Sequence, residues 1–205
     1  MAESAQAASR TATSWRVSRP QDAENEVVVD ALVTIINAAY SRGEEGMWRN
    51  PATERTNPEE VKKLLLAEEL ILIFSKEDDE EDETILGSVM CKAPFKKDNE
   101  ELAELGMLAV AENATGLGLG SQLIEAAETH ARSKGCTIMR LEILSPAEYV
   151  HPFKQRLHKW YCRLGYEPGP VEDFKESYPA LADLLAVKCK FQVYHKPLVA
   201  PASSA

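Results

Sequence analysis

Three glycines at alternate positions, Gly116, Gly118 and Gly120, stand between an apolar run and an amphipathic segment. Because glycine has no side chain, a ligand can approach the main chain closely there, and the first amides of a helix point outward as donors without partners. The dipole of the helix adds positive potential at the same end, which favours a phosphate group. The spacing therefore predicts a strand, a glycine-rich turn that binds phosphate, and a helix.

Two common phosphate-binding motifs do not fit this turn. The dinucleotide motif G-x-G-x-x-G requires a third glycine, but Ser121 stands at that position when the motif starts at Gly116, and Leu123 when it starts at Gly118. The phosphate loop of nucleotide hydrolases ends in Gly-Lys followed by Ser or Thr, and no lysine lies between Gly116 and Ser121. Spacing thus excludes both kinds of nucleotide site.

Residues 104–123, ELGMLAVAENATGLGLGSQL, resemble the acetyl-coenzyme A signature of the GNAT acetyltransferase superfamily. That signature is a Gln or Arg, two residues, Gly, one residue, and Gly or Ala, after a strand of the type ELxxLAV. Thr115 replaces the Gln or Arg, which implies weaker rather than abolished binding, because the family contacts phosphate mostly through backbone amides. The resemblance implies acetyl-CoA as co-substrate, held by these residues: Leu108, Ala109, Val110, Thr115, Gly116, Leu117, Gly118, Leu119, Gly120 and Ser121.

Glu104 is the predicted general base. An alkylamine has a pKa of about 10.4, so holding it neutral at pH 7 costs about 4 to 5 kcal/mol, and an enzyme usually supplies a base or a water relay. The period of a strand puts Glu104, Gly106 and Leu108 on one face. Aligned on ELGMLAV, Glu104 resembles the base of the histone-acetylating branch of the family. A strand-end carboxylate exposed to water, or paired with a lysine, is the alternative.

Tyr161 is the predicted general acid. The segment WYCRLGYEP, residues 160–168, resembles the family pattern of Tyr, three residues, Gly, then Phe or Tyr, in which the phenol protonates the leaving thiolate. A core tyrosine is the alternative. Seven and four residues earlier, Lys154 and Leu157 replace the family's Asn and Ala. The loop 145–154 is therefore predicted either to shape a distinct acceptor pocket or to contact coenzyme A through Lys154.

The resemblance also places the two substrates. The pantetheine arm would lie in a gap between the strand 102–110 and its parallel neighbour 137–144, with the amide of Leu108 at the thioester carbonyl and the backbone of Val110 at the pantetheine. The acceptor would bind at the loop 41–57, where three residues could receive an ammonium by charge and cation–π contact. These are Glu44, Glu45 and Trp48. A flexible loop whose tryptophan packs against the sheet is the alternative.

Hydrophobic patterns predict the elements that position these residues. A right-handed crossover makes the strand 137–144 parallel to 102–110. The predicted fold is the GNAT fold, an α/β structure whose mixed twisted sheet of six to seven strands carries helices on both faces. One domain is predicted over 14–198, between tails at 1–13 and 199–205. Strands are predicted at 15–19, 69–75, 84–95, 102–110, 137–144, from Tyr166, and at 188–198, and helices at 20–40, 58–69, 118–133, 153–165 and 179–187.

The amino-acid composition limits the classes of partner that the chain is expected to bind. The 205 residues are 44% hydrophobic, which suits one compact domain, and carry a formal net charge of −10. This charge disfavours nucleic acid and anionic membranes and mildly favours cationic substrates. Much of it lies in EDDEEDE, residues 77–83, which is predicted to be a solvated loop. Without a long apolar stretch or a signal peptide, the chain is predicted to be cytoplasmic.

Cysteine and histidine spacings predict no metal site, since neither residue type shows paired ligand spacing. The cysteines are predicted to be reduced and mostly buried. They are Cys91, Cys136, Cys162 and Cys189, and the histidines are His130, His151, His158 and His195.

The sequence thus predicts an N-acetyltransferase that moves an acetyl group from acetyl-CoA to a primary amine, favouring a small molecule, by direct transfer in a ternary complex. A protein N-terminus or a lysine is the alternative acceptor. An alternative function is a degenerate acyl-CoA sensor or partner-binding module, suggested by the departures at Thr115 and Lys154. Dimers are common in the family, so a homodimer is one of the open alternatives.

Overall fold

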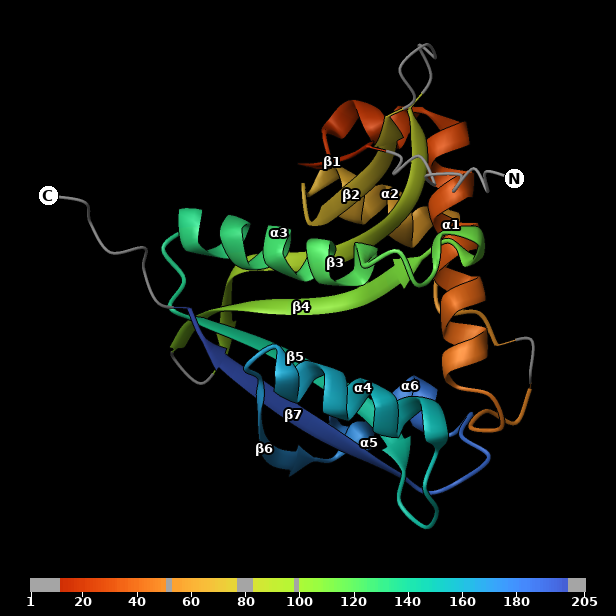
Figure 1. Ribbon diagram of the computed structural model, residues 1–205. Helices are drawn as coiled ribbons and strands as arrows, with labels where there is room; N and C mark the ends of the chain where they lie inside the picture. The colour runs from red at the N-terminus through yellow and green to blue at the C-terminus, as the bar shows by residue number, and fades with distance from the viewer. Residues whose placement is uncertain (1–11, 51–52, 77–82, 98–99, 199–205) are drawn as a thin grey trace, which may run out of the picture.

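A computed structural model describes residues 12–50, 53–76, 83–97 and 100–198. Most of the two predicted tails, most of the acidic segment 77–83, and the expected turn at Asp98 and Asn99 lie outside the described residues. The described chain forms one mixed sheet with helices packed on both faces (Figure 1). The predicted fold class is confirmed.

The described residues form a seven-stranded sheet in the order β1-β2-β3-β4-β5-β7-β6. Neighbouring strands are antiparallel except β4 and β5, which are parallel, as the crossover through the intervening helix requires. The strands are β1 Ala12–Val17, β2 Leu70–Lys76, β3 Thr84–Lys97, β4 Glu100–Val110, β5 Ile138–Pro146, β6 Glu167–Glu172 and β7 Cys189–Pro197.

Alternation along the strands explains why both faces are covered. In β2, Ile71 and Ile73 pack into one core with α3 and α4, whereas Leu70 and Leu72 pack into a second core with α1 and α2. The helices are α1 Glu26–Gly43, α2 Pro58–Leu66, α3 Leu119–Ser133, α4 Pro152–Arg163, α5 Phe174–Ser177 and α6 Pro179–Ala182, and short 3-10 turns span Pro20–Glu24 and Glu112–Ala114.

The first predicted helix, 20–40, is divided. A 3-10 turn comes first, and α1 starts only after Asn25, whose side chain accepts a hydrogen bond from the amide of Val27. The strand before it ends at Val17 rather than at 19, because the carboxylate of Asp22 accepts a 2.7 Å hydrogen bond from the amide of Arg19 and turns the chain. The predicted cap at Asn57 is confirmed by its bond from the amide of Glu60.

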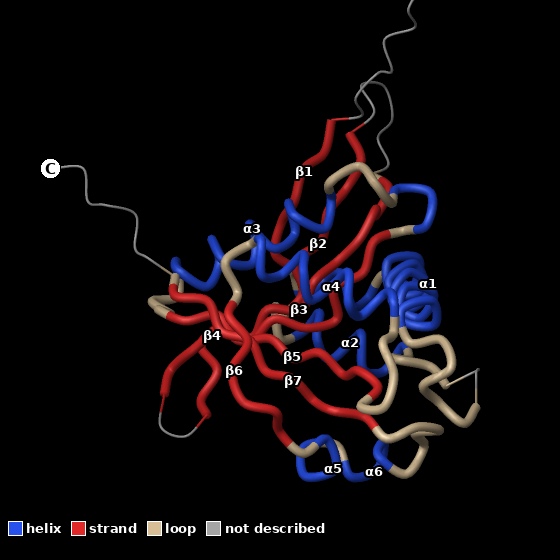
Figure 2. Tube along the Cα trace, turned by 60° about the horizontal axis from the view of Figure 1, so that its bottom comes forward, coloured by secondary structure: helices blue, strands red, loops and turns tan. Residues whose placement is uncertain are grey.

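The helix predicted at 179–187 begins at Pro179 as expected but is shorter than predicted. It is α6, with four residues, and α5 precedes it unpredicted. Asp173 caps α5 by accepting from the amide of Lys175, and after α6 Leu185 forms an isolated bridge with Trp48. Figure 2 shows α5 and α6 together beside β7, at the end of the sheet.

The parallel strands β4 and β5 pair over only three positions, the last of them Leu105 with Leu141. Met107, two residues later, has a φ of +48°, in the left-handed region that bends a strand. The two strands then diverge, as Figure 1 shows on the side of α1 and α4. The predicted gap between these strands is therefore present.

Candidate functional site

A cavity of about 280 Å³, which we call the central cavity, lies between the diverging ends of β4 and β5. Leu105–Val110 and Leu141–Leu144 form two of its walls, and α1 and α4 close the others through Tyr40 and Tyr161. The predicted residues Leu108, Ala109, Val110, Thr115 and Lys154 all line it. The gap therefore brings together the backbone of β4, the start of the glycine turn and the predicted acid.

The glycine turn presents unpartnered donors. Gly116 and Gly118 have φ values of +81° and +80°, and Gly118 is the residue that precedes α3. The amides of residues 116–120 make no hydrogen bond to the described part of the chain. A Cβ at Gly116 or Gly118 would meet nothing within 4 Å, and the first turn of α3 has no acidic residue. Such a turn can take a phosphate group.

Thr115 does not take over the role of the longer side chain that it replaces. Its hydroxyl donates a 2.9 Å hydrogen bond to the backbone oxygen of Glu112, three residues earlier in the chain. This side chain therefore stabilises the approach to the turn.

Replacing Gly118 by alanine is expected to weaken coenzyme A binding about tenfold, since a shifted amide would lose a hydrogen bond to a charged phosphate. The left-handed φ also costs an L residue about 1 to 2 kcal/mol. Gly135→Ala is the matched control, because Gly135 has a φ of +83° and open space but lies after the far end of α3. Calorimetric titration with coenzyme A should separate the two. Equal losses of affinity would contradict the role of the turn.

Tyr161 combines burial with an unpartnered hydroxyl. Its side chain is 6% exposed, and its ring packs against Trp160, Tyr166 and Tyr194. Among the described residues, no group forms a hydrogen bond with its hydroxyl, although that hydroxyl belongs to a residue of the central cavity wall. Burial raises the pKa of Tyr161 far above its usual range. The phenol is therefore a protonated donor that faces a cavity, which a purely structural tyrosine would not need.

Glu104 belongs to a cluster of charged residues on neighbouring strands. It is opposite Arg140 in the register of β4 and β5, and the Arg140 guanidinium donates to Glu104 at 3.3 Å and to Glu172 at 3.0 Å. Glu142 also pairs with Arg140. Three carboxylates therefore share one arginine. The alternative predicted for Glu104, a water-exposed or lysine-paired carboxylate, is wrong, because Glu104 is largely buried and its partner is an arginine.

A second cavity, of about 130 Å³, adjoins the central cavity, and we call it the aromatic cavity. Glu104 and Glu142 lie in its wall, and Glu142, Tyr40 and Gly106 are shared with the central cavity. Burial raises the pKa of Glu142, although the charge of Arg140 opposes that effect. The aromatic side chains of this cavity are Tyr40, Trp48, Phe174, Tyr178 and Phe191.

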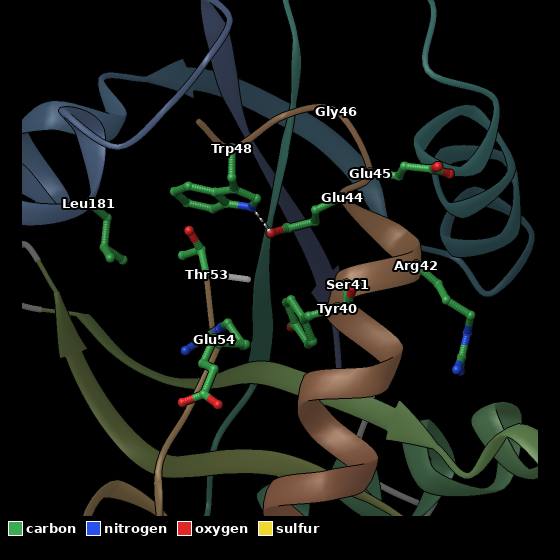
Figure 3. Close-up of a pocket in the computed structure, with 11 residues that line it drawn as sticks. Tyr40, Ser41, Arg42, Glu44, Glu45, Gly46, Trp48, Thr53, Glu54 and Leu181 are labelled. Atoms are coloured by element: carbon green, nitrogen blue, oxygen red, sulfur yellow. Dashed lines mark hydrogen bonds between the residues drawn. The ribbon is translucent and has the colours of Figure 1, made fainter. Parts of the chain in front are cut away.

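The predicted acceptor residues line a third, outer cavity of about 480 Å³ (Figure 3). The Glu44 carboxylate accepts hydrogen bonds from the indole of Trp48 at 2.8 Å and from the ammonium of Lys154 at 2.9 Å. Glu44 therefore already has a cationic partner, and Lys154 points to Glu44. Figure 3 shows Glu45 pointing away from Trp48. Trp48 packs edge-on against Phe174, on α5.

Sequence reasoning missed four residues of this site, namely Tyr40, Arg140, Glu142 and Tyr178. The signal for two of them was the RLE of β5, which places two charges on one face of an otherwise apolar strand. Tyr40 lies in the last turn of the amphipathic helix α1 and lines all three cavities, with the Arg55 guanidinium 5.2 Å from its ring centroid. No local pattern marks Tyr178.

The loop 145–154 lines a separate cavity of about 270 Å³. That cavity shares Ile143 and Lys154 with the central cavity and no residue with the aromatic or outer cavity. In it, the ring of His158 hydrogen-bonds the hydroxyl of Tyr194 at 2.9 Å. The loop 145–154 therefore contributes no residue to the aromatic cavity or to the outer cavity.

The remaining predictions concern metal ligands, cysteines and membrane-spanning helices. Within the described ranges, no group of three His, Cys, Asp or Glu side chains is placed to hold a metal ion. Cys91 and Cys136 are buried as predicted, but the prediction is wrong for Cys162, which is exposed. Among the described helices, none has the length and apolar character needed to cross a bilayer.

Comparison with known proteins matches the chain to one family. The model of the acetyltransferase (GNAT) family matches residues 32–166. No curated protein sequence matches. An aminoglycoside 6'-N-acetyltransferase complexed with coenzyme A has a TM-score of 0.61 at 16% identity, over 94% of this chain and 99% of that one.

Two further solved structures are similar. The NatC complex bound to Gag peptide and CoA has a TM-score of 0.61 at 16% identity, over 91% of this chain and 99% of that one. The protein yncA from Salmonella typhimurium, with its cofactor acetyl-CoA, has a TM-score of 0.59 at 16% identity, over 95% and 98%. At these identities the structures show a shared fold.

Proposed function

Because the chain belongs to the GNAT acetyltransferase family, we propose that it transfers an acetyl group from acetyl-CoA, the co-substrate of this family, to a primary amine in a ternary complex. A small-molecule amine is the favoured acceptor. The observation that carries the proposal is Tyr161, a buried residue whose hydroxyl has no hydrogen-bond partner among the described residues. It lines a cavity that also contains the diverging strands and the start of the glycine turn. Similar structures include an enzyme for aminoglycosides and a complex bound to a peptide, so the fold serves both kinds of acceptor.

The described residues fit coenzyme A. The unpartnered amides of residues 116–120 would hold the pyrophosphate, and the backbone of Leu108 and Val110, in the gap, would hold the pantetheine. When bound, acetyl-CoA supplies an activated acetyl thioester. Lys154 is not needed for this binding, because its ammonium is paired with Glu44.

Glu104 and Tyr161 carry the two proton transfers in this proposal. Glu104 accepts a proton from the bound ammonium, the neutral nitrogen bonds to the acetyl carbon as the carbon–sulfur bond breaks, and the nitrogen releases its second proton to water. Tyr161 gives its hydroxyl proton to the departing sulfur. Over a turnover, Glu104 releases a proton to water and Tyr161 regains one. Glu104 lines the aromatic cavity and Tyr161 the central cavity, and the two cavities adjoin at Gly106 and Glu142, which line both.

A degenerate sensor is the second candidate, and the use of Thr115 within its own loop favours it. Both candidates bind coenzyme A. Only the enzyme releases free thiol in proportion to an added amine.

The purified chain with acetyl-CoA should therefore release thiol when primary amines are added, as measured with a thiol reagent against a reaction without amine. Mass spectrometry of the product should show the acetyl group on the amine. Tight coenzyme A binding without thiol release, across small amines and peptides, would favour the sensor.

A further inference from the structure

We propose that the acceptor is a primary amine carried on a flat apolar or aromatic body, and that it binds in the aromatic cavity with its ammonium at Glu104 and Glu142. This inference rests on the proposed acetyl transfer and names its substrate class. The geometry behind it is a cavity lined by five aromatic side chains and by Glu104 and Glu142, and Glu142 also lines the adjoining central cavity.

The walls suit a ring. Phe174, Tyr178 and Phe191 form a packed group with ring centroids 5.2 to 5.6 Å apart, and the edge-on contact of Trp48 with Phe174 extends this group towards α1. These residues come from the loop after α1, from α5, from the segment that joins α5 to α6, and from β7. Offset and edge-on arrangements of this kind accept a further aromatic ring, and their faces also attract a cation.

The charged groups of the aromatic cavity determine where the ammonium of the acceptor lies. Tyr178, Glu104 and Glu142 line the same cavity, and burial, then the charges of Glu142 and Glu104, raise the pKa of Tyr178 to about 12. Glu104 and Glu142 both line the cavity and share one guanidinium, that of Arg140. Of the other charged groups in the lining, Glu44 is paired with Lys154, and the guanidinium of Arg55 lies over the ring of Tyr40. Glu142 reaches both cavities, and the unpartnered Tyr161 hydroxyl faces the adjoining central one. An ammonium held at Glu104 and Glu142 therefore lies next to the transfer site.

The same walls disfavour more polar acceptors. Much of the lining is apolar, including Leu144, Met90 and Met107, which offer no partner to a hydroxyl or an amide. The charged side chains of the lining are Glu44, Arg55, Glu104 and Glu142. Burying a hydroxyl or an amide without a hydrogen bond costs free energy, which acts against an aminoglycoside or a peptide N-terminus.

A polyamine is disfavoured for a different reason. Its second ammonium would reach the outer cavity, where Arg42 and Arg55 offset the exposed Glu45 and Glu54, and where Lys154 already neutralises Glu44. A single ammonium on an apolar body matches this distribution of charge better.

The first experiment compares acceptors at fixed acetyl-CoA, with thiol release as the readout. The probes are 2-phenylethylamine, propylamine, spermidine, kanamycin and tetra-alanine. We expect kcat/KM for 2-phenylethylamine to exceed that for propylamine by about tenfold or more, since the phenyl group buries more apolar surface in the cavity than the propyl chain does. Faster reaction of spermidine, kanamycin or the peptide would overturn the inference and leave acetyl transfer intact. No release with any amine, despite coenzyme A binding, would overturn the proposed function as well.

The second experiment tests the wall itself. Tyr178 is 38% exposed, so Tyr178→Ala should fold, and it should lower the preference for 2-phenylethylamine over propylamine about tenfold with coenzyme A affinity unchanged. Tyr149→Ala is the matched control, because Tyr149 is also exposed but lines neither the aromatic nor the central cavity. An unchanged preference in Tyr178→Ala, or an equal fall in the control, would overturn the assignment.

Discussion

Tyr161→Phe is expected to lower kcat about 100-fold while leaving the free energy of unfolding unchanged or slightly higher. The loss in rate follows because the departing sulfur would have to leave as an unprotonated thiolate, and a positioned general acid contributes about 100-fold or more. The stability is retained because the hydroxyl has no hydrogen-bond partner among the described residues, so phenylalanine removes a buried polar atom and no bond. Steady-state kinetics and urea unfolding measure the two quantities.

Tyr166→Phe is the matched control. Tyr166 is also buried and packs against Tyr161, but its hydroxyl donates to Glu128 at 3.1 Å and it lines none of the three cavities. Phenylalanine there should lower the free energy of unfolding by about 1 to 2 kcal/mol and leave kcat nearly unchanged. If Tyr161→Phe behaved like this control, with stability lost and turnover kept, Tyr161 would be a core residue.

Glu104→Gln is expected to lower kcat/KM for the amine about 100-fold, because a positioned general base contributes at least that much. The pH profile of kcat/KM should change as well. Only the rise due to deprotonation of the amine itself, at higher pH, should remain. The affinity for coenzyme A should not change, since Glu104 lines the aromatic cavity and not the central one.

Glu172→Gln tests whether the fall in kcat/KM of Glu104→Gln arises only because Arg140 has lost a carboxylate partner. Glu172 accepts from the same guanidinium, but it lies on β6 and lines none of the three cavities. We expect nearly normal kcat/KM and a normal pH profile for this variant. If Glu104→Gln also kept the wild-type pH profile, Glu104 would not be the base, and Glu142, which reaches both cavities, would be the next carboxylate to replace.

Local sequence patterns predicted most of the fold. The alternation in β2, the caps at Asn57 and Gly135, and the alternate glycines each depend on residues within a few positions of one another. The errors occur where a distant contact competes with a local pattern. The helix predicted at 179–187 ends at Ala182, because Leu185 forms a bridge with Trp48, which is distant from it in the sequence.

The sequence by itself determined the glycine-rich turn, the strand before it, and Glu104 and Tyr161 as candidate residues, because a turn, a strand and a helix are specified by neighbouring residues. Only the tertiary structure decided what these residues face. Glu44 is paired with Lys154, 110 positions away, and Glu104 with Arg140, 36 positions away. The aromatic cavity likewise joins Trp48 to Phe191. Such partners are chosen by strand order and by helix packing, which no spacing along the chain encodes.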